Sequence, residues 1–226
     1  VYTADPRIVK NARKIDEIIY DEMLELATSG AKVLHNRSVE MAKKYGVELV
    51  VRSSLTSEEG TVVKEVVKME KMLITGVAAD RNTVRISAIG VKDEPGIAFK
   101  LFNTLARNNI NVDIILQSVG RNGTKDISFT VSEDDLQEAL QILEEKKDVL
   151  TIKEITYSTD VAKVSIVGAG MLSNPGVAAK MFESLFNSNI NISMISTSEI
   201  RITVLIDEKD TEKAMIAIHD GFGLND

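Results

Sequence analysis

Residues Val84 to Ser118 read VRISAIGVKDEPGIAFKLFNTLARNNINVDIILQS, and residues Val164 to Ser198 read VSIVGAGMLSNPGVAAKMFESLFNSNINISMISTS. Aligned at an offset of 80 positions without a gap, the two stretches share 14 of 35 residues. The chain therefore contains an internal duplication. In each copy a β-branched run is followed by a Pro-Gly pair, an amphipathic stretch and a second apolar run (112–119 in the first copy), which predicts strand, loop, helix and strand.

The residues that the copies share lie mostly where an element is expected to begin or end. They are the pairs Gly90/Gly170, Pro95/Pro175, Gly96/Gly176, Asn109/Asn189 and Asn111/Asn191. Gly and Pro set the backbone geometry of such joints, so structure alone accounts for these identities. One apolar stripe also recurs at helical spacing and predicts the core face of a helix: Ile97, Leu101, Phe102 and Leu105, then Val177, Met181, Phe182 and Leu185.

Each copy continues with a further strand and a further helix. The strands are expected at Asp126–Val131 and Glu199–Ile206, and the helices at Glu133–Lys146 and Lys209–Asp220. A last strand near 150–157 completes the first copy. The order strand-helix-strand-strand-helix-strand predicts an α+β fold of the ferredoxin-like type (βαββαβ), with two helices on one face of an antiparallel sheet.

The second copy has no final strand of its own. After its last helix only residues 221–226 (GFGLND) remain, which are too few and too rich in Gly for a strand. Leu73–Ala79 (LITGVAA), which precedes the first copy, is an apolar strand that the first copy does not need. We therefore predict that Leu73–Ala79 pairs with a strand of residues 160–206, which makes the first copy an insertion within the second module.

Residues 1–66 differ from the repeats. We expect a helix over Asp16–Ala27, a second helix over Arg37–Tyr45 and a buried strand over Val47–Arg52, followed by a loop and a linker over 62–72. Two helices and one strand are too few layers for an independent core. This segment is therefore interpreted as the end of a larger α/β domain.

The amino-acid composition limits the class of protein to which the chain can belong. The chain has 226 residues, 44% hydrophobic and 27% charged, which is typical of a soluble globular protein with two or three small domains. It has no Cys and only two His, so we expect no disulfide, no metal site and a reducing, cytoplasmic environment. A net charge of −7 and 4% aromatic residues argue against nucleic acid as a partner. No apolar run is long enough to predict a membrane span.

Two short motifs in the N-terminal part resemble the end of the catalytic domain of aspartate kinases. They are Tyr2–Arg7 (YTADPR) and Gly30–His35 (GAKVLH). In that family these elements flank ATP, so the resemblance implies nucleotide contacts at Tyr2, Asp5, Arg7 and Lys32. Arg and Lys neutralise polyphosphate, and an aromatic ring can lie against adenine. The sequence departs from the family at Lys10 and Asn36, where Pro is common.

The resemblance covers the whole chain, because aspartate kinases carry two ferredoxin-like ACT domains behind the catalytic domain. Its most specific part is Ser196–Ile200 (STSEI) following Asn189–Asn191 (NIN). It implies three parts: the C-terminal remnant of an amino-acid-kinase catalytic domain at 1–66, a first ACT domain at 83–158, and a second ACT domain made of 67–82 plus 159–226.

The loop before each repeated helix offers backbone N–H groups at a helix start, at Gly96, Ile97 and Ala98 and again at Gly176, Val177 and Ala178. Such a nest favours an anion, and a free amino acid supplies its carboxylate to it. The resemblance implies that lysine and threonine, singly or in concert, are the effectors. It places the contacts of the first module at Asp93, Gly96, Ala98, Asn111, Val112, Asp113 and Gln117. It places those of the second module at Met171, Ser173, Val177, Ile192, Ser193, Ser198 and Glu199.

The function that the resemblance implies is the regulatory region of an aspartate kinase, with feedback inhibition by lysine and/or threonine. The family uses ATP and Mg²⁺ to convert L-aspartate to 4-phospho-L-aspartate, the first step of lysine, threonine and methionine biosynthesis. We expect no cofactor and no activity in this fragment, because the family's other catalytic motifs are expected upstream, and we expect a homodimer or larger assembly through the ACT domains. The alternative is a non-catalytic amino-acid-sensing subunit that assembles with a separate kinase chain. Tyr2–Arg7 favours the first interpretation, because a pure sensor does not need it.

Other functions of the same fold fit less well. Gly168, Ala169 and Gly170 hint at a dinucleotide-binding loop, but the next Gly is at 176 and the expected sheet is antiparallel. RNA-binding modules of this fold need aromatic residues on central strands, where only Phe129 is found, and metallochaperones need a Cys pair.

Overall fold

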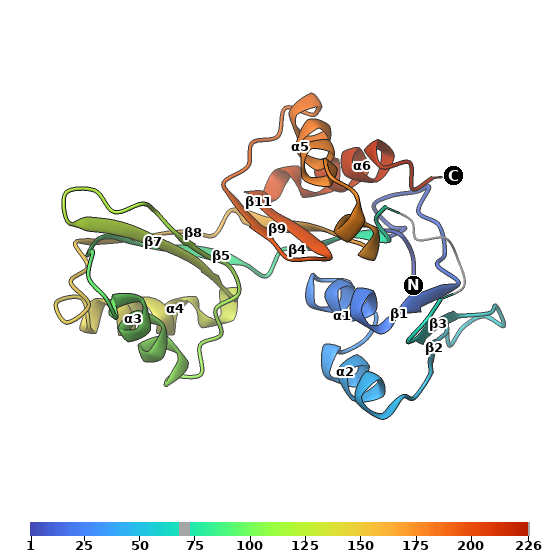
Figure 1. The fold of residues 1–226 in the computed structure, drawn as a ribbon, viewed down its shortest axis with the longest axis horizontal. Coiled ribbons are helices and arrows are strands. Elements are labelled where there is room, and N and C mark those ends of the chain that lie inside the picture. The colour runs from blue at the N-terminus through green and yellow to red at the C-terminus, as the bar shows by residue number, and fades with distance from the viewer. Residues whose placement is uncertain (68–72, 226) are drawn as a thin grey trace. The chain divides into compact units, whose positions relative to one another are not determined.

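A computed structural model describes residues 1–67 and 73–225 of the chain (Figure 1). The chain divides into two units. One consists of Val1–Arg81 together with Lys163–Asp226, and the other of Asn82–Ala162. The first unit contains the N-terminal segment (residues 1–66) and most of the second module, which we number as residues 67–82 and 159–226; residue 82 and residues 159–162 of that module fall in the other unit. The other unit contains the first module (residues 83–158).

The first module is a four-stranded antiparallel sheet with two helices on one face (Figure 1). Its strands run in the order β6-β7-β5-β8, with β5 at Val84–Lys92, β6 at Ile115–Gln117, β7 at Thr124–Val131 and β8 at Glu154–Ser158. The helices are α3 at Ile97–Ala106 and α4 at Leu136–Glu145, the latter preceded by the 3-10 turn η1 at Glu133–Asp135. The fold predicted for this copy is confirmed.

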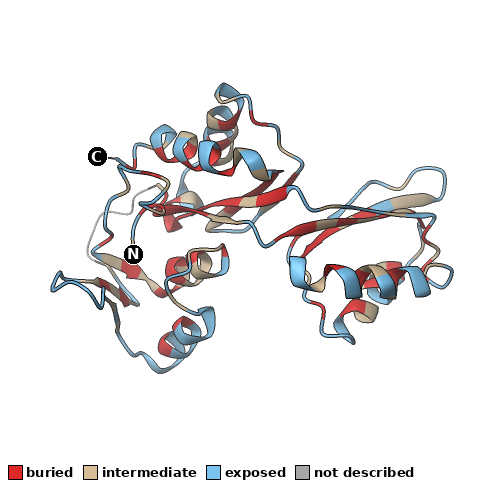
Figure 2. Ribbon diagram, turned by 180° about the vertical axis from the view of Figure 1, so that it is seen from behind, coloured by how far each residue is buried: buried red, intermediate tan, exposed pale blue. Residues whose placement is uncertain are grey.

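The predicted apolar stripe of α3 lies in the core of the first module. Leu101 and Leu105 are fully buried, together with Phe129 of β7. Phe102 packs edge-on against Phe129, with ring centroids 5.6 Å apart. Figure 2 shows the same pattern throughout, since helices are buried on the side that faces a sheet and exposed on the other.

The second module has the same architecture. Its strands run in the order β10-β11-β9-β4, with β4 at Gly76–Asp80, β9 at Val161–Val167, β10 at Met194–Thr197 and β11 at Arg201–Asp207. The helices are α5 at Val177–Asn187 and α6 at Thr211–Gly221, and the 3-10 turns are η2 at Ala169–Ser173 and η3 at Glu208–Asp210.

The fourth strand of the second module comes from before the first module, as predicted. β4 pairs antiparallel with β9, from Gly76 opposite Val167 to Asp80 opposite Lys163. β4 therefore takes the edge position that β8 has in the first module. The strand begins at Gly76 instead of Leu73, and residues 68–72 of the predicted linker lie outside the described residues.

β4 is apolar on both faces because it contributes to two cores. Val77 lies in the core beneath α5 and α6, whereas Ala78 lies in the core of the N-terminal segment. On β9, Ile166 and Val167 divide between the same two cores. A sheet covered on both faces needs continuous apolar strands instead of alternating ones.

The N-terminal segment contains a three-stranded sheet, whereas the sequence predicted a single strand there. Its elements are β1 at Glu17–Ile19, α1 at Tyr20–Thr28, α2 at Asn36–Tyr45, β2 at Leu49–Val51 and β3 at Thr61–Lys64. The sheet order is β1-β3-β2, with β1 parallel and β2 antiparallel to β3. The helix that ends at Tyr45 before Gly46 is confirmed.

Three predictions for this segment were wrong. The helix expected from Asp16 begins at Tyr20, because Glu17–Ile19 pairs with β3. Residues 61–64 form the central strand of the sheet instead of part of a linker. The strand expected to be buried over 47–52 is shorter and lies at an edge, and Val50 is 54% exposed.

Two strands of the first module are also shorter than predicted. The strand expected over 112–119 is β6 at Ile115–Gln117. The strand expected near 150–157 begins at Glu154, because residues 150–153 still turn after α4: Leu150 N donates to Lys146 O, and Thr151 has a φ of 53°.

Within residues 1–67 and 73–225, no helix has the length and apolar character needed to span a membrane.

Candidate functional site

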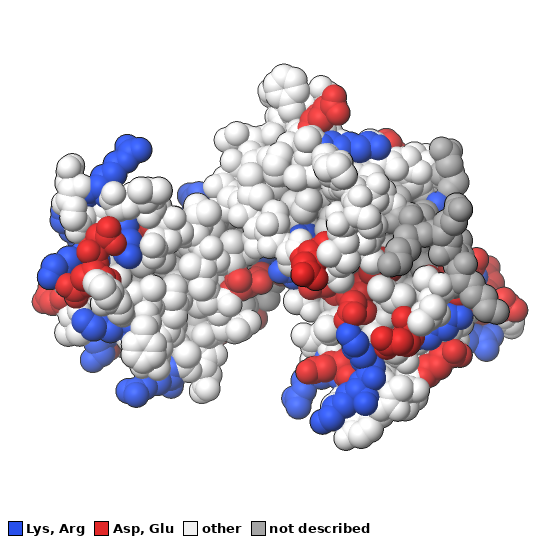
Figure 3. All heavy atoms as spheres, viewed as in Figure 1, with Lys and Arg blue, Asp and Glu red and all other residues white. Residues whose placement is uncertain are grey.

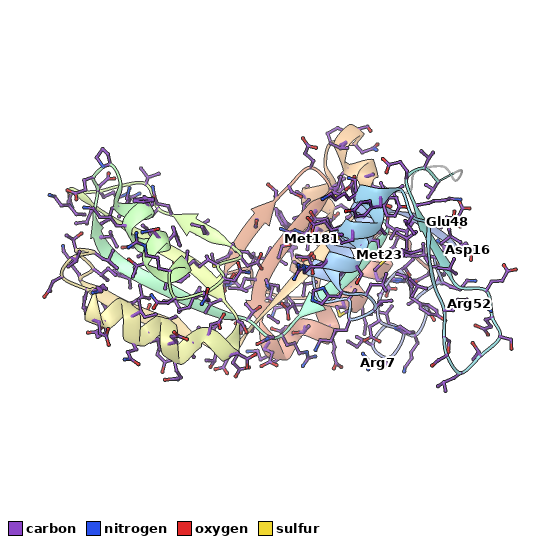
Figure 4. The ribbon with its side chains drawn as sticks, turned by 90° about the horizontal axis from the view of Figure 1, so that it is seen from below. Arg7, Asp16, Met23, Glu48, Arg52 and Met181 are labelled. Atoms are coloured by element: carbon purple, nitrogen blue, oxygen red, sulfur yellow. The ribbon has the colours of Figure 1, made fainter. Side chains whose placement is uncertain are left out.

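The predicted nucleotide-contacting loop is organised by an ion pair. Arg7 Nη2 lies 2.6 Å from Asp5 Oδ2, and the backbone N–H of Arg7 donates to Asp5 Oδ1 at 2.9 Å. The hydrogen bond from Arg7 holds the pKa of the Asp5 carboxyl below its usual value, and the same bond raises the pKa of Arg7. The Arg7 side chain is 86% exposed and lies at the margin of the ribbon in Figure 4. Asp5 thus orients a guanidinium that faces solvent.

Lys32 and Tyr2 are exposed on other parts of the N-terminal segment. Lys32 follows the end of α1, where the backbone N–H of Ala31 donates to Leu26 O at 3.0 Å. Lys32 has no ion-pair partner among the residues that the structure describes. The backbone of Tyr2 forms an isolated bridge with Lys14, and its side chain is exposed. The structure therefore brings Asp5 and Arg7 together, and among the described residues neither Tyr2 nor Lys32 forms a hydrogen bond or ion pair with them.

The residues of this segment fit phosphate and base better than a metal ion. Figure 3 shows Lys, Arg, Asp and Glu mixed around α1 and α2, where Asp21 pairs with Lys43 at 2.5 Å. In the described part of the chain, no three His, Cys, Asp or Glu side chains gather as ligands of one metal ion. Mg²⁺ therefore has no carboxylate cage among these residues.

In the first module, Asp93 joins the loop before α3 to the β6–β7 hairpin. Its carboxylate lies 3.0 Å from Lys125 Nζ, and its backbone N–H donates to Gly123 O at 2.9 Å. The Lys125 side chain is only 10% exposed. A Cβ on Gly120 would lie 2.0 Å from Asp93 Oδ2, so the hairpin approaches this carboxylate closely. Asp93 is thus an anchored carboxylate that already has a cationic partner.

Both repeated helices start from a left-handed glycine. Gly96 has a φ of 88° and Gly176 a φ of 93°, a conformation that L side chains rarely adopt. In the second module the N–H groups of Gly176, Val177 and Ala178 have no acceptor in the described residues. In the first module the same holds for Gly96 and Ala98, whereas the N–H of Ile97 is directed at Glu94 O at 3.5 Å. Each helix start therefore presents free donors to an anion.

The remaining predicted contacts of the first module lie on the segment that leads into β6. Asn111, Asp113 and Gln117 are exposed, and Val112 is half-buried. The backbone N–H of Asp113 donates to Thr130 O at 3.1 Å, so this segment lies along β7.

In the second module, hydrogen bonds hold together the loops that carry the predicted contacts. Met171 and Ser173 lie in η2, and the N–H of Gly168 just before η2 donates to Ile200 O at 2.9 Å. That bond places η2 beside the β10–β11 turn, which carries Ser198 and Glu199. Ser198 N donates to Arg201 O at 2.8 Å and closes the turn.

Two other predicted contacts of this module have apolar side chains that serve the core. Val177 is buried among the core residues, and Ile192 packs against the same core. For Val177, only the backbone N–H is therefore available to a ligand. Ser193 donates its N–H to Leu205 O at 2.8 Å and lies exposed beside Ile192.

The sequence interpretation missed a polar contact between the N-terminal segment and the second module. Glu22 of α1 is only 8% exposed, and its Oε1 accepts hydrogen bonds from Thr75 Oγ1 and from the backbone N–H of Ala169, both at 2.8 Å. One signal was available. Glu22 lies four residues before Leu26, on the apolar side of an amphipathic helix, where an unpaired carboxylate is costly.

Comparison with known proteins agrees with this geometry. Residues 84–146 and 164–222 match the ACT domain family, and residues 1–53 match the amino acid kinase family. The fold and the paired helix starts thus define a protein with two ACT domains joined to a segment of an amino acid kinase.

Individual relatives narrow the class. An aspartokinase of Bacillus sp. (strain MGA3) is 49% identical over 226 residues, which are 100% of this chain and 55% of that protein. A chain in the crystal structure of aspartokinase alpha and beta subunits is 47% identical with a TM-score of 0.63, over 66% of this chain and 99% of that chain. The crystal structure of E. coli aspartokinase III in complex with lysine and aspartate matches at 29% identity with a TM-score of 0.77, over 98% of this chain and 49% of that one.

The chain belongs to the aspartokinase family. It spans about half the length of the curated relatives that it matches.

Proposed function

We propose that this chain is the amino-acid-binding regulatory region of an aspartate kinase and takes lysine and/or threonine as effectors. The observation that carries the proposal is the pair of helix starts at Gly96 and Gly176, where backbone N–H groups have no acceptor among the described residues, in a chain of the aspartokinase family. A crystal structure of E. coli aspartokinase III contains lysine, which supports this ligand class.

The effector's carboxylate binds the N–H nest, and its ammonium needs an acidic partner. Asp113 and Glu199 are exposed candidates for that partner. Asp93 already pairs with Lys125, so an ammonium there shares the carboxylate with a lysine. The position 80 residues after Asp93 is Ser173, so the two modules present different charges at equivalent places. We propose that the modules differ in affinity for the two effectors for this reason.

The whole protein, on this proposal, phosphorylates L-aspartate with ATP and Mg²⁺. Bound ATP supplies the transferable phosphoryl group. In this chain Arg7 and Lys32 neutralise phosphate charge, Tyr2 lies against the base, and Asp5 fixes the direction of the Arg7 guanidinium. We propose that other parts of the protein supply the remaining catalytic groups and the metal ligands, since no three His, Cys, Asp or Glu side chains gather among the described residues.

We also propose that the protein assembles as a homodimer or larger through the ACT domains, in the cytoplasm. The edge strands β6 and β10 carry the exposed apolar side chains Ile115, Leu116 and Ile195, and unpaired strand edges are joining surfaces. Lack of cysteine suits a reducing compartment.

Calorimetric titration of L-lysine and of L-threonine into the purified chain tests the proposal, with an assay of aspartate phosphorylation alongside. We expect saturable heat with at least one of the two amino acids and no turnover by the chain alone. D-lysine and D-threonine are the matched controls. Turnover by this chain, or no heat with either L-amino acid, would count against the assignment.

A second candidate is a non-catalytic regulatory subunit, which the match to 99% of the regulatory subunit of aspartate kinase from Thermus thermophilus favours. That match covers only 66% of the present chain. The amino acid kinase match at 1–53 favours the first candidate.

Binding of ATP by this chain, abolished by Arg7→Ala with Lys32→Ala, would support the first candidate. Equal nucleotide affinity of the wild type and the double variant would support the second.

A further inference from the structure

One buried side chain connects the N-terminal segment to the effector loops of the second module. Glu22 of α1 accepts two hydrogen bonds at one oxygen, from Thr75 Oγ1 and from the N–H of Ala169. Ala169 is the first residue of η2, the turn that carries Met171 and Ser173. The helix α1 therefore holds the start of a proposed effector loop directly.

The loop before η2 has little room to move independently of this contact. A Cβ on Gly168 would lie 2.4 Å from Ile74 Cα, so the backbone of the loop lies against the chain just before β4. Thr75 N, in turn, donates to Val167 O at 2.6 Å. A displacement of η2 must therefore be accommodated by Glu22, by Thr75, or by both.

A second contact joins the same helix to the other effector loop. Arg201 Nη1 lies 2.9 Å from Glu25 Oε2, and both side chains are largely buried. Arg201 is the first residue of β11 and closes the turn of Ser198 and Glu199 through its carbonyl. Glu22 and Glu25 are neighbours on one side of α1, since they are three residues apart. One helix thus contacts both loops that carry the proposed effector residues of the second module.

The C-terminal end of α1 leads to a proposed nucleotide contact. Ser29 N donates to Glu25 O at 2.9 Å and Ala31 N donates to Leu26 O at 3.0 Å, which ties the turn to the helix. Lys32 follows immediately. Figure 1 shows α1 against the second module's sheet, on the face opposite α5 and α6.

We infer that α1 transmits effector binding at the second module to the loop of Lys32, and that Glu22 and Glu25 are the positioning residues of this link. The inference rests on the proposed function, because it takes residues 171–173 and 198–199 as effector contacts. An effector that shifts η2 or the β10–β11 turn changes the hydrogen bonds of Glu22 or the ion pair of Glu25. The helix then moves as a body, and Lys32 moves with it.

Amide hydrogen exchange of the whole chain, with and without saturating L-lysine or L-threonine, tests the link. In the wild type, exchange of residues 29–34 should change by about 5-fold or more on binding, the lower range of allosteric coupling. Glu22→Ala should retain effector affinity within about 3-fold, because Glu22 touches no proposed ligand atom, and should lose the response at 29–34.

Three further variants separate the link from a merely structural role. Glu22→Gln keeps an acceptor oxygen for both donors and should restore the response. Arg201→Gln should weaken it through the second contact. Asp21→Ala, on the same helix but paired with Lys43 of α2, should leave the response unchanged. A response at 29–34 that is equal in the wild type and in Glu22→Ala would overturn the inference.

A ligand-free measurement separates the two claims. Without effector, Glu22→Ala should speed exchange at residues 168–173, and Asp21→Ala should not. Unchanged exchange in Glu22→Ala would overturn the inference even where lysine or threonine binds. If neither amino acid binds the wild type, the proposed function is wrong and so is the effector link. Faster exchange at 168–173 in Glu22→Ala would still show that α1 holds η2 in place.

Discussion

His219 is fully buried at the contact between α6 and the N-terminal segment, and its Nε2 lies 2.9 Å from Thr3 Oγ1. Burial lowers the pKa of the imidazole, since a charged ring would lose its hydration. Thr3 Oγ1 also accepts the backbone N–H of Arg13. A neutral histidine therefore helps to hold the N-terminal loop on the second module.

Stability should fall as the pH drops below the unfolded-state pKa of histidine, about 6.5. Below that pH the histidine of the unfolded chain binds a proton that the buried His219 of the native chain does not bind. The contribution of His219 to the free energy of unfolding is therefore complete above that pH and is lost on acidification. Denaturant titrations from pH 8 to pH 5, compared with His219→Gln, measure it. The variant should show a shallower decline, and equal slopes for the two proteins would show that His219 titrates normally.

Backbone conformation at single residues gives a second prediction. Gly176→Ala forces an L side chain into the left-handed region and should cost about 1–2 kcal/mol of unfolding free energy. Asn189 has a φ of 53°, so Asn189→Gly should cost little or nothing by comparison. Urea denaturation of both variants provides the comparison. Equal losses would mean that the conformation at Gly176 is not the cause.

Among the elements, the duplicated helices and the crossover strand were predictable from local patterns. The apolar stripes that contain Leu101 in α3 and Met181 in α5 have helical spacing. Most of β4 lies in a short apolar run for which the first copy offered no partner strand. β1 and β3 were missed because each is short and becomes a strand through pairing with residues distant in the chain, Glu17 with Val62. Periodicity over three or four residues cannot reveal such a pairing.

The candidate site also has one feature that the sequence predicts and one that only the structure shows. The glycine helix starts follow from sequence, because a Pro-Gly pair before an apolar stripe marks them locally. The contacts of Glu22 with Thr75 and Ala169 depend on the N-terminal segment meeting two distant stretches of the second module, so only the structure provides them.

β4 should tolerate substitution poorly on both faces. Ala78 is buried in the core of the N-terminal segment, so Ala78→Leu overpacks that core and should cost about 1–3 kcal/mol. Ala179→Leu, on the exposed side of α5, is the matched control and should be nearly neutral. Thermal unfolding monitored by circular dichroism measures both. A neutral Ala78→Leu would contradict the double role of β4.

At the scale of the whole molecule, the first module is an insertion between two paired strands. Asp80 lies opposite Lys163, and these residues form an ion pair at 3.1 Å. Replacing residues 82–161 with a short Asn-Gly turn should therefore leave a hairpin and a folded remainder. The excised residues 82–161 should also fold cooperatively, because they contain a complete sheet and core.

Circular dichroism and denaturant titration of the two pieces check this prediction. The matched control is residues 159–226 alone, which lack β4 and should not fold cooperatively. A folded control piece would show that the crossover strand is not required. An unfolded remainder after the replacement would contradict the interpretation of the first module as an insertion.

We propose above that amino-acid effectors bind at the repeated helix starts. Recording amide resonances of the whole chain during titration with L-lysine and L-threonine tests this most directly. We expect saturable shifts concentrated at residues 93–98, at residues 171–178, or at both, with slower amide exchange at the N–H groups of the helix starts. Binding that leaves these amides unchanged and perturbs other residues would contradict the proposal.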